Sequence, residues 1–156
     1  MPKMPNLENE LKLDNADITK KLVDKIRKAK RIYIIGNGGS AANAMHLIND
    51  LLSCGIRAYT MDMATFSAFA NDHGYYKAFE RWIGIVGEAG DLLIALSGSG
   101  KSPNILLACE AAERIGMDVH REFGAEQGFD MQRAEERQIA LGHELMRDIK
   151  SGIKCA

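Results

Sequence analysis

Two loops rich in glycine and serine carry the strongest chemical signal in the sequence. One runs from Gly36 to Ala42 and reads GNGGSAA, and the other runs from Ser97 to Asn104 and reads SGSGKSPN. Each follows an apolar run typical of a β-strand and precedes a segment with helical periodicity. Glycine lets the backbone approach an anion closely, serine hydroxyls donate hydrogen bonds, and the start of a helix offers free N–H groups. The two loops therefore predict a phosphate-binding site.

A second group of residues has side chains suited to metal binding or proton transfer. His46 and Asp50 are four residues apart in a helical pattern, so they share a face and lie about 6 Å apart along the axis. Glu135 and His143 repeat these residue types near the C-terminus, about 12 Å apart along a helix. Imidazole and carboxylate groups bind divalent metals and exchange protons near neutral pH. Either pair taken alone is more typical of a solvated helix face than of a functional site.

Two kinds of nucleotide site are alternatives for the same loops. The run GNGGSA satisfies the dinucleotide fingerprint with Ala41 in place of the third glycine, and Asp62 lies about where a ribose-binding acid would follow. The second loop falls one residue short of a nucleoside-triphosphatase P-loop, because Ala95 replaces its leading glycine. Neither alternative accounts for both loops, so we favour a small phosphorylated ligand.

The apolar pattern predicts the elements that must position these residues. Strands are predicted at 31–36, 56–61 and 91–97, with a weaker, charge-rich strand at 117–123. Helices are predicted at 17–30, 40–53, 65–86 with an interruption at NDHGYY, 103–115 and 131–150. Such alternation is typical of an α/β fold with a mainly parallel sheet, whose ligands bind at the carboxyl ends of the strands.

Length and composition set further bounds. The 156 residues predict a single domain, 1–156, with a polar and partly ordered N-terminal arm over 1–15. A net charge of -1 from 20 basic and 21 acidic residues gives no electrostatic footprint for nucleic acid or a membrane surface. Cys54, Cys109 and Cys155 are scattered, which argues against a disulfide framework or a thiolate metal cluster. No signal-peptide pattern or long apolar run is present, so we expect a cytoplasmic protein.

Several motifs then occur in the order found in the sugar isomerase (SIS) domain family: GNGGSA, HLINDL, FANDHGYY, SGSGKSPN and EERQIALGH. More narrowly, the sequence resembles the phosphoheptose (sedoheptulose 7-phosphate) isomerases over 32–117 and 131–149. The resemblance implies a three-layer α/β/α, flavodoxin-like fold. It also implies an aldose–ketose isomerase that transfers a proton through an enediol(ate), assembled as a homotetramer with shared active sites.

The resemblance implies roles for particular residues as well. The phosphate would bind Ser97, Gly98, Ser99 and Ser102, and Gly98 stands where many members carry threonine. The sugar would be lined by Asn37, Gly38, Gly39, Ser40, Asn71, Asp72 and Glu135. A zinc site would fall on His46, Asp50, Glu135 and His143, with Asp50 and His143 as the catalytic proton carriers.

Two departures from the family pattern accompany this resemblance. The best-known phosphoheptose isomerases carry Glu and Gln where this chain has Asp50 and Glu135, although two imidazoles and two oxygen ligands still suit zinc. The segment 117–131 is also shorter than in the family, which has a further strand there, so we expect a shortened sheet. A non-catalytic SIS module that binds a phosphosugar or assembles with a protein, like the replication-initiator-associating relatives, is the alternative. A Rossmann dinucleotide-binding protein is a third hypothesis for the function.

Overall fold

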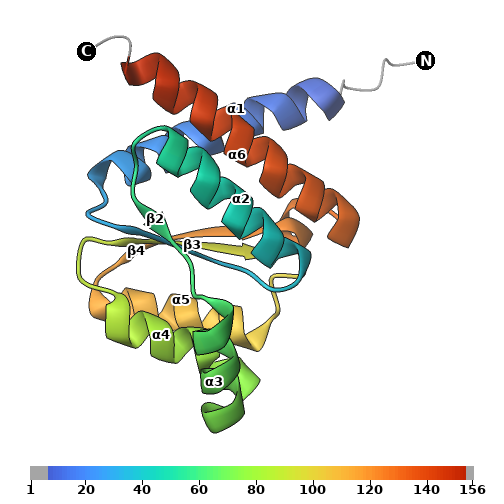
Figure 1. Ribbon diagram of the computed structural model, residues 1–156. Helices are drawn as coiled ribbons and strands as arrows, with labels where there is room; N and C mark the ends of the chain where they lie inside the picture. Colours follow the sequence, from blue (N-terminus) through green and yellow to red (C-terminus); the bar gives the residue numbers. More distant parts are fainter. Residues whose placement is uncertain (1–6, 154–156) are drawn as a thin grey trace.

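Four parallel strands form the sheet at the centre of the molecule (Figure 1). The computed structural model describes residues 7–153, and side chains from 16 to 152. The strands are β1 (Ile32–Ile35), β2 (Ala58–Tyr59), β3 (Leu92–Ser97) and β4 (Asp118–Phe123), in the order β2-β1-β3-β4. Each neighbouring pair is parallel. The expected α/β fold is confirmed, and its strand order is that of flavodoxin-like sheets.

Helices cover both faces of this sheet, which gives three layers. Helices α1 (Leu7–Lys28), α2 (Gly39–Ser53) and α6 (Met131–Ile153) lie on one face, and α3 (Met63–His73), α4 (Ala78–Val86) and α5 (Pro103–Ile115) lie on the other (Figure 1). Two short 3-10 helices lie in the connections: η1 (Tyr75–Lys77) between α3 and α4, and η2 (Gly124–Gln127) between β4 and α6. Helix α1 is longer than predicted. Residues 7–15, expected to belong to an arm, are helical, and residues 1–6 lie outside the described part.

Alternate residues of the central strands supply two cores. Ile32 and Ile34 of β1 pack among the helices α1, α2 and α6, whereas Tyr33 and Ile35 pack on the side of α3, α4 and α5. All four side chains are buried. A strand covered on both faces has no solvent side, which is why β1 is apolar throughout and β3 is apolar up to its last residue, Ser97.

Helix α2 packs with a different stripe than the periodicity suggested. The helical spacing of the apolar residues predicts an inward stripe of Ala41, Met45, Ile48 and Leu52. The side chains of Met45 and Leu52 are instead 65% and 55% exposed. The buried apolar positions are instead Ala44, Leu47 and Leu51. The reason is that α6 covers a second side of α2, so the helix turns its polar face toward α6 and leaves Met45 and Leu52 uncovered.

The charged strand β4 is accommodated because its charged side chains are paired. Asp118 forms an ion pair with Lys25 of α1, with 2.8 Å between the Lys25 Nζ and Asp118 Oδ1 atoms. Glu122 is buried and lies 3.3 Å from His120, and it accepts a hydrogen bond of 3.0 Å from Gln127. Arg137 of α6 contacts the same carboxylate at 3.7 Å. These pairs explain how a run with so many charges completes a sheet.

Two further sequence expectations concern cysteines and membranes. Cys54 and Cys109 are free thiols, and burial raises the pKa of Cys109 to about 11. Cys155 lies outside the described residues. Within 7–153, the helices are too short or too polar to cross a bilayer.

Candidate active site

The two glycine- and serine-rich loops meet at the carboxyl ends of adjacent strands. The chain leaves β1 toward the face covered by α2, and it leaves β3 toward the opposite face, covered by α5. Loops that diverge in this way leave a crevice, which is where open α/β sheets bind ligands. A cavity of about 40 Å³ lies there, lined by Asn37, Ser40, Leu96, Ser97, Gly98, Ser99, Ser102 and Met131. Both loops thus contribute predicted phosphate- or sugar-binding residues to one cavity.

The second loop, Ser97 to Asn104, here called the serine loop, is held in shape by its own hydroxyl groups. The backbone N–H of Gly100 donates to Ser97 Oγ at 2.9 Å, and that of Lys101 donates to Ser99 Oγ at 3.2 Å. Gly100 has a φ of 66°, a left-handed conformation that favours glycine. A hydroxyl that accepts a hydrogen bond still has its own hydrogen to donate. Ser97 and Ser99 can therefore each donate to a phosphate oxygen.

The first loop, Gly36 to Ala42, here called the glycine loop, requires glycine at its first position. A Cβ on Gly36 would lie 2.6 Å from the backbone of Ser40, so a side chain there would push the loop away from the start of α2. Gly98 of the other loop is equally confined, because a Cβ there would overlap the thioether of Met131. Met131 therefore fills the place that a larger residue at position 98 would occupy.

Helices α2 and α6 run side by side in the same direction and carry the titratable residues (Figure 1). Their contacts keep a nearly constant offset in sequence, pairing Asn43 with Gln138, His46 with His143, and Ser53 with Met146. When two parallel helices pack at a constant offset, each residue of one helix lies opposite the residue of the other at the corresponding position. This arrangement is what places a histidine of each helix opposite the other.

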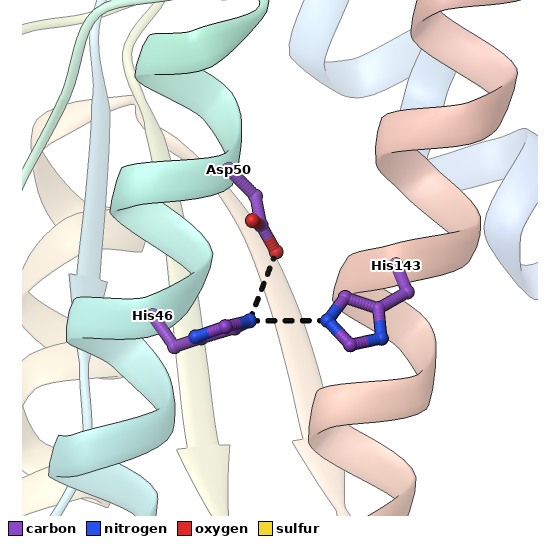
Figure 2. Close-up of side chains that lie close together, drawn as sticks. All are labelled: His46, Asp50 and His143. Atoms are coloured by element: carbon purple, nitrogen blue, oxygen red, sulfur yellow. Dashed lines mark hydrogen bonds and ion pairs between the residues drawn. The ribbon is translucent and has the colours of Figure 1, made fainter.

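His46, Asp50 and His143 form one cluster (Figure 2). His46 Nε2 lies 3.1 Å from His143 Nε2 and 3.4 Å from Asp50 Oδ2. Asp50 is only 6% exposed, and its Oδ2 atom has no hydrogen-bond partner. A buried carboxylate oxygen without a donor is costly unless a proton or a cation compensates it. The cluster is therefore suited to binding a proton or a metal ion.

Two of the distances within the cluster match those between the ligands of a tetrahedral zinc ion. Ligand atoms about 2.0–2.2 Å from a tetrahedral ion lie about 3.3 Å from one another. The two distances from His46 Nε2 are close to this value, and the three ligand atoms all lie within 4.8 Å of one another. Two imidazole nitrogens and one carboxylate oxygen are a donor set that zinc accepts, with a position left for substrate or water.

Glu135, the fourth expected metal ligand, is not part of this cluster. Its carboxylate lies against Gly39 at the first turn of α2, where a Cβ on that glycine would overlap it. The backbone carbonyl of Glu135 accepts a 3.0 Å hydrogen bond from Asn43. Two helical turns separate Glu135 from His143, and the parallel packing of the helices preserves that separation. Glu135 consequently stands at the glycine loop.

A buried hydrogen-bond chain joins this part of α6 to the glycine loop. Gln138 donates to Ser40 Oγ at 3.0 Å and accepts from Asn43 at 2.9 Å. Ser40 and Gln138 are both buried. The family resemblance implies a contact of Ser40 with the sugar, but its contact with Gln138 spans 98 residues and has no local sequence signal.

Two other expected sugar-binding residues lie further out. Asn71 and Asp72 are exposed on the last turn of α3 and are hydrogen-bonded to each other at 3.1 Å. The segment reaches the crevice through Tyr75 instead, whose hydroxyl donates to Asn37 Oδ1 at 3.0 Å. Neither Tyr75 nor its neighbour Asn104 was among the predicted site residues.

Asp62, the ribose-binding candidate of the dinucleotide alternative, has a different role. It is the N-cap of α3, and its carboxylate accepts from the backbone N–H of Thr65 at 2.9 Å and from the Thr65 hydroxyl at 2.6 Å. These hydrogen bonds lower the pKa of Asp62. Both carboxylate oxygens are thus engaged within the helix cap, which removes the support for a Rossmann site.

Comparison with known proteins gives the family. The sequence profile of the SIS domain matches residues 5–120, about three quarters of the chain. The chain belongs to the SIS domain family. Among solved structures, a phosphoheptose isomerase from Neisseria gonorrhoeae aligns with a TM-score of 0.79 and 26% identity over 92% of this chain and 89% of that one. The three-layer fold expected from the SIS motifs is therefore confirmed.

Curated relatives carry the same name. A phosphoheptose isomerase of Akkermansia muciniphila is 38% identical in an alignment 112 positions long, which covers 67% of this chain and 59% of the relative. One from Trichlorobacter lovleyi is 29% identical in a gapped alignment 169 positions long, which covers 94% of this chain and 86% of the relative. The match to the enzyme of Desulfovibrio desulfuricans covers 48% of that protein. For some of these relatives, then, the chain spans only about half of the length.

Proposed function

We propose that this SIS domain protein is an aldose–ketose isomerase whose substrate is sedoheptulose 7-phosphate. The observation that carries the proposal is the His46, Asp50 and His143 cluster on α2 and α6, the helices whose first turns border the phosphate-type crevice. A module that only binds sugar has no need for a buried carboxylate oxygen that lacks a hydrogen-bond donor and lies beside two imidazoles. The relatives named phosphoheptose isomerase support the choice of substrate.

The reaction moves a hydrogen between two neighbouring carbons. A base removes a proton from C1 of the ketose to give an enediolate, the hydroxyl proton on the C1 oxygen passes to the C2 oxygen, and an acid returns a proton to C2. C1 then becomes the aldehyde carbon. Such a reaction needs a base, an acid and donors for the developing oxyanion. The serine loop would hold the phosphate, which is remote from C1, and so align the reacting end.

Asp50 and His143 are the proton carriers in this proposal. Both belong to the cluster within 4.8 Å, so one proton can pass between them by way of His46. A carboxylate and an imidazole cover the acid and base roles near neutral pH. The half-buried Glu135, at the glycine loop, is a third group able to accept a proton from the sugar.

Zinc is the proposed metal, with His46, Asp50 and His143 as the residues that would hold it. It would supply Lewis-acid polarisation of the sugar carbonyl. A lone pair that binds a metal cannot accept a proton, so the ligand atoms of Asp50 and His143 would not act as bases in the metal-loaded protein. Proton transfer in the metal-loaded protein would then fall to Glu135.

The test is an isomerisation assay in D₂O followed by NMR. Incubation with sedoheptulose 7-phosphate should introduce deuterium at C1 or C2 and yield an aldose phosphate. His143→Ala should abolish both signals while the protein still binds inorganic phosphate. Parallel samples of the wild type and Glu135→Gln, each with zinc and with EDTA, identify the base. If Glu135 is the base in the zinc-loaded protein, Glu135→Gln should lose activity with zinc; if Asp50 and His143 carry the protons without metal, it should stay active with EDTA. A folded protein that binds the sugar phosphate but exchanges no deuterium would instead be a non-catalytic SIS module.

We further propose a homotetramer with shared active sites, as the resemblance implies. The exposed Met45 and Leu52 of α2 support an interface beside the histidine cluster, since Met45 immediately precedes His46.

A further inference from the structure

We propose that Asn104 and Tyr75 are positioning residues that fix the side-chain amide of Asn37, so that it presents an N–H donor to the sugar. The inference rests on the proposed function for the identity of the ligand. Its structural part concerns three side chains from three separate segments: the glycine loop, the start of α5, and η1.

Asn37 and Asn104 form a reciprocal amide pair. Asn37 Nδ2 donates to Asn104 Oδ1 at 2.8 Å, and Asn104 Nδ2 donates to Asn37 Oδ1 at 2.8 Å. Asn104 is only 1% exposed and lies at the first turn of α5, directly after Ser102 and Pro103 of the serine loop. Two matched hydrogen bonds to a buried partner hold the plane of the Asn37 amide.

Tyr75 contacts the oxygen side of that amide. Its hydroxyl donates to Asn37 Oδ1 at 3.0 Å, so this oxygen accepts two hydrogen bonds. The ring of Tyr75 is held in turn by Phe66, with ring centroids 5.2 Å apart in an edge-to-face arrangement. While the Tyr75 hydroxyl donates, the amide oxygen and not the NH₂ group faces it.

Counting the donors and acceptors of Asn37 gives the consequence. Its oxygen has two lone pairs, and both are used. Its nitrogen has two hydrogens, and one is used. The remaining N–H belongs to a residue that lines the crevice cavity together with Ser97, Ser99 and Ser102. Asn37 can thus only donate to a ligand, which suits a sugar oxygen that gains negative charge during enolisation.

The same contacts join the two loops across the crevice. Asn37 follows β1 and Asn104 follows the serine loop, and their pair spans 67 residues of sequence. A phosphate bound in the serine loop and a sugar oxygen bound by Asn37 are therefore held by two loops that are hydrogen-bonded to each other. Such a connection is what positions the reacting end of a substrate relative to a remote phosphate.

The experiment compares Tyr75→Phe with Tyr76→Phe. The two tyrosines are neighbours with similar exposure, 54% and 51%, and the substitution keeps each ring and deletes one hydroxyl. We expect Tyr75→Phe to weaken binding of sedoheptulose 7-phosphate about fivefold, and to lower kcat/KM at least as much, with inorganic phosphate binding unchanged. Tyr76→Phe should match the wild type. Asn104→Asp, which cannot donate to Asn37, should have the larger effect.

A second measurement tests the positioning without any ligand. The side-chain amide of Asn37 should exchange with solvent slowly in the wild type and in Tyr76→Phe, and faster in Tyr75→Phe, by ¹⁵N NMR. Unchanged exchange in Tyr75→Phe would overturn the positioning role, as would an equal loss of sugar phosphate and inorganic phosphate binding. If the exchange rates change as expected but no variant, nor the wild type, turns over the sugar, then the proposed function fails and the positioning of Asn37 stands. Tyr75→Phe alters an exposed hydroxyl only, so it remains informative if Asn104→Asp does not fold.

Discussion

At the scale of single residues, the serine hydroxyls make the phosphate site testable. Ser99 and Ser102 line the crevice cavity, and neither hydroxyl hydrogen is needed to hold the loop. Replacing either by Ala should weaken sugar-phosphate binding by about 1–2 kcal/mol, the value of one hydrogen bond to a charged group. Calorimetry on the two variants measures this, with Ser151→Ala on the exposed end of α6 as the control. Wild-type affinity in both variants would contradict a phosphate site here.

Gly39 offers a second prediction at this scale. A Cβ at this position would overlap the Glu135 carboxylate, so Gly39→Ala should displace that side chain. Gly39 is exposed, and its backbone has no left-handed φ, so the fold should tolerate alanine. We expect kcat to fall about tenfold or more if Glu135 acts on the sugar, because misplacing a catalytic group by about 1 Å is costly. Affinity for inorganic phosphate should stay at the wild-type value. A wild-type kcat would exclude Glu135 from the chemistry.

Local spacing explains which site residues the sequence revealed. His46 and Asp50 are four residues apart on one helix, and their proximity follows from helix geometry alone. The contact of His46 with His143 depends on how α2 packs against α6, and only the family motifs suggested it. Asn104 and Tyr75 had no such signal, because an amide pair between distant loops resembles two ordinary loop residues until the sheet brings them together.

At the scale of elements, strong local signals fixed the boundaries best. Helix α5 begins at Pro103 and ends before Gly116, as predicted, because proline favours the first helical turn and glycine adopts the left-handed φ of 92° that ends the helix. The inward face of α2 was predicted wrongly, because periodicity shows that a helix has two faces and cannot show that α6 covers the polar one. Strand β4 was rated weak on its charges, which tertiary pairing neutralises.

Strand β4 and helix α6 also give a pH prediction. Burial raises the pKa of the Glu122 carboxyl, but hydrogen bonds from His120 and Gln127 and the charge of Arg137 outweigh it, so the pKa lies below its usual value. A carboxyl with a depressed pKa in the folded state adds stability above its unfolded pKa, about 4.3, and loses it as pH falls through the folded value.

Glu122→Gln should therefore destabilise the protein at pH 7, by about 2–3 kcal/mol, since it removes the charge facing Arg137, which is 7% exposed. The difference from wild type should shrink as the pH falls below about 4. Urea unfolding between pH 3 and pH 7 measures both, with the exposed Glu110→Gln as the control. A difference that does not depend on pH would show that packing, and not charge, is responsible.

At the scale of the whole molecule, the uncovered stripe of α2 is the feature that the isolated chain does not explain. Met45 and Leu52 are seven residues apart, so they lie on one stripe of the helix, and both side chains are mostly exposed. Contiguous exposed apolar groups mark interaction sites more often than ordinary surface. The stripe borders His46, which is itself half exposed. A second copy seated on this stripe would therefore close the solvent side of the histidine cluster.

This geometry predicts that assembly and activity are lost together. Met45→Glu places a charge in the stripe without touching the buried core, so the variant should stay folded by circular dichroism while its oligomer dissociates toward the 17.2 kDa chain in mass photometry. Isomerase activity should fall with the oligomer and recover at protein concentrations that restore it, as mass action requires. Ser67→Glu, on an exposed position of α3, adds the same charge elsewhere and should change neither. A Met45→Glu protein that is monomeric but fully active would show that each chain carries a complete site, whereas an intact oligomer would place the interface on another face.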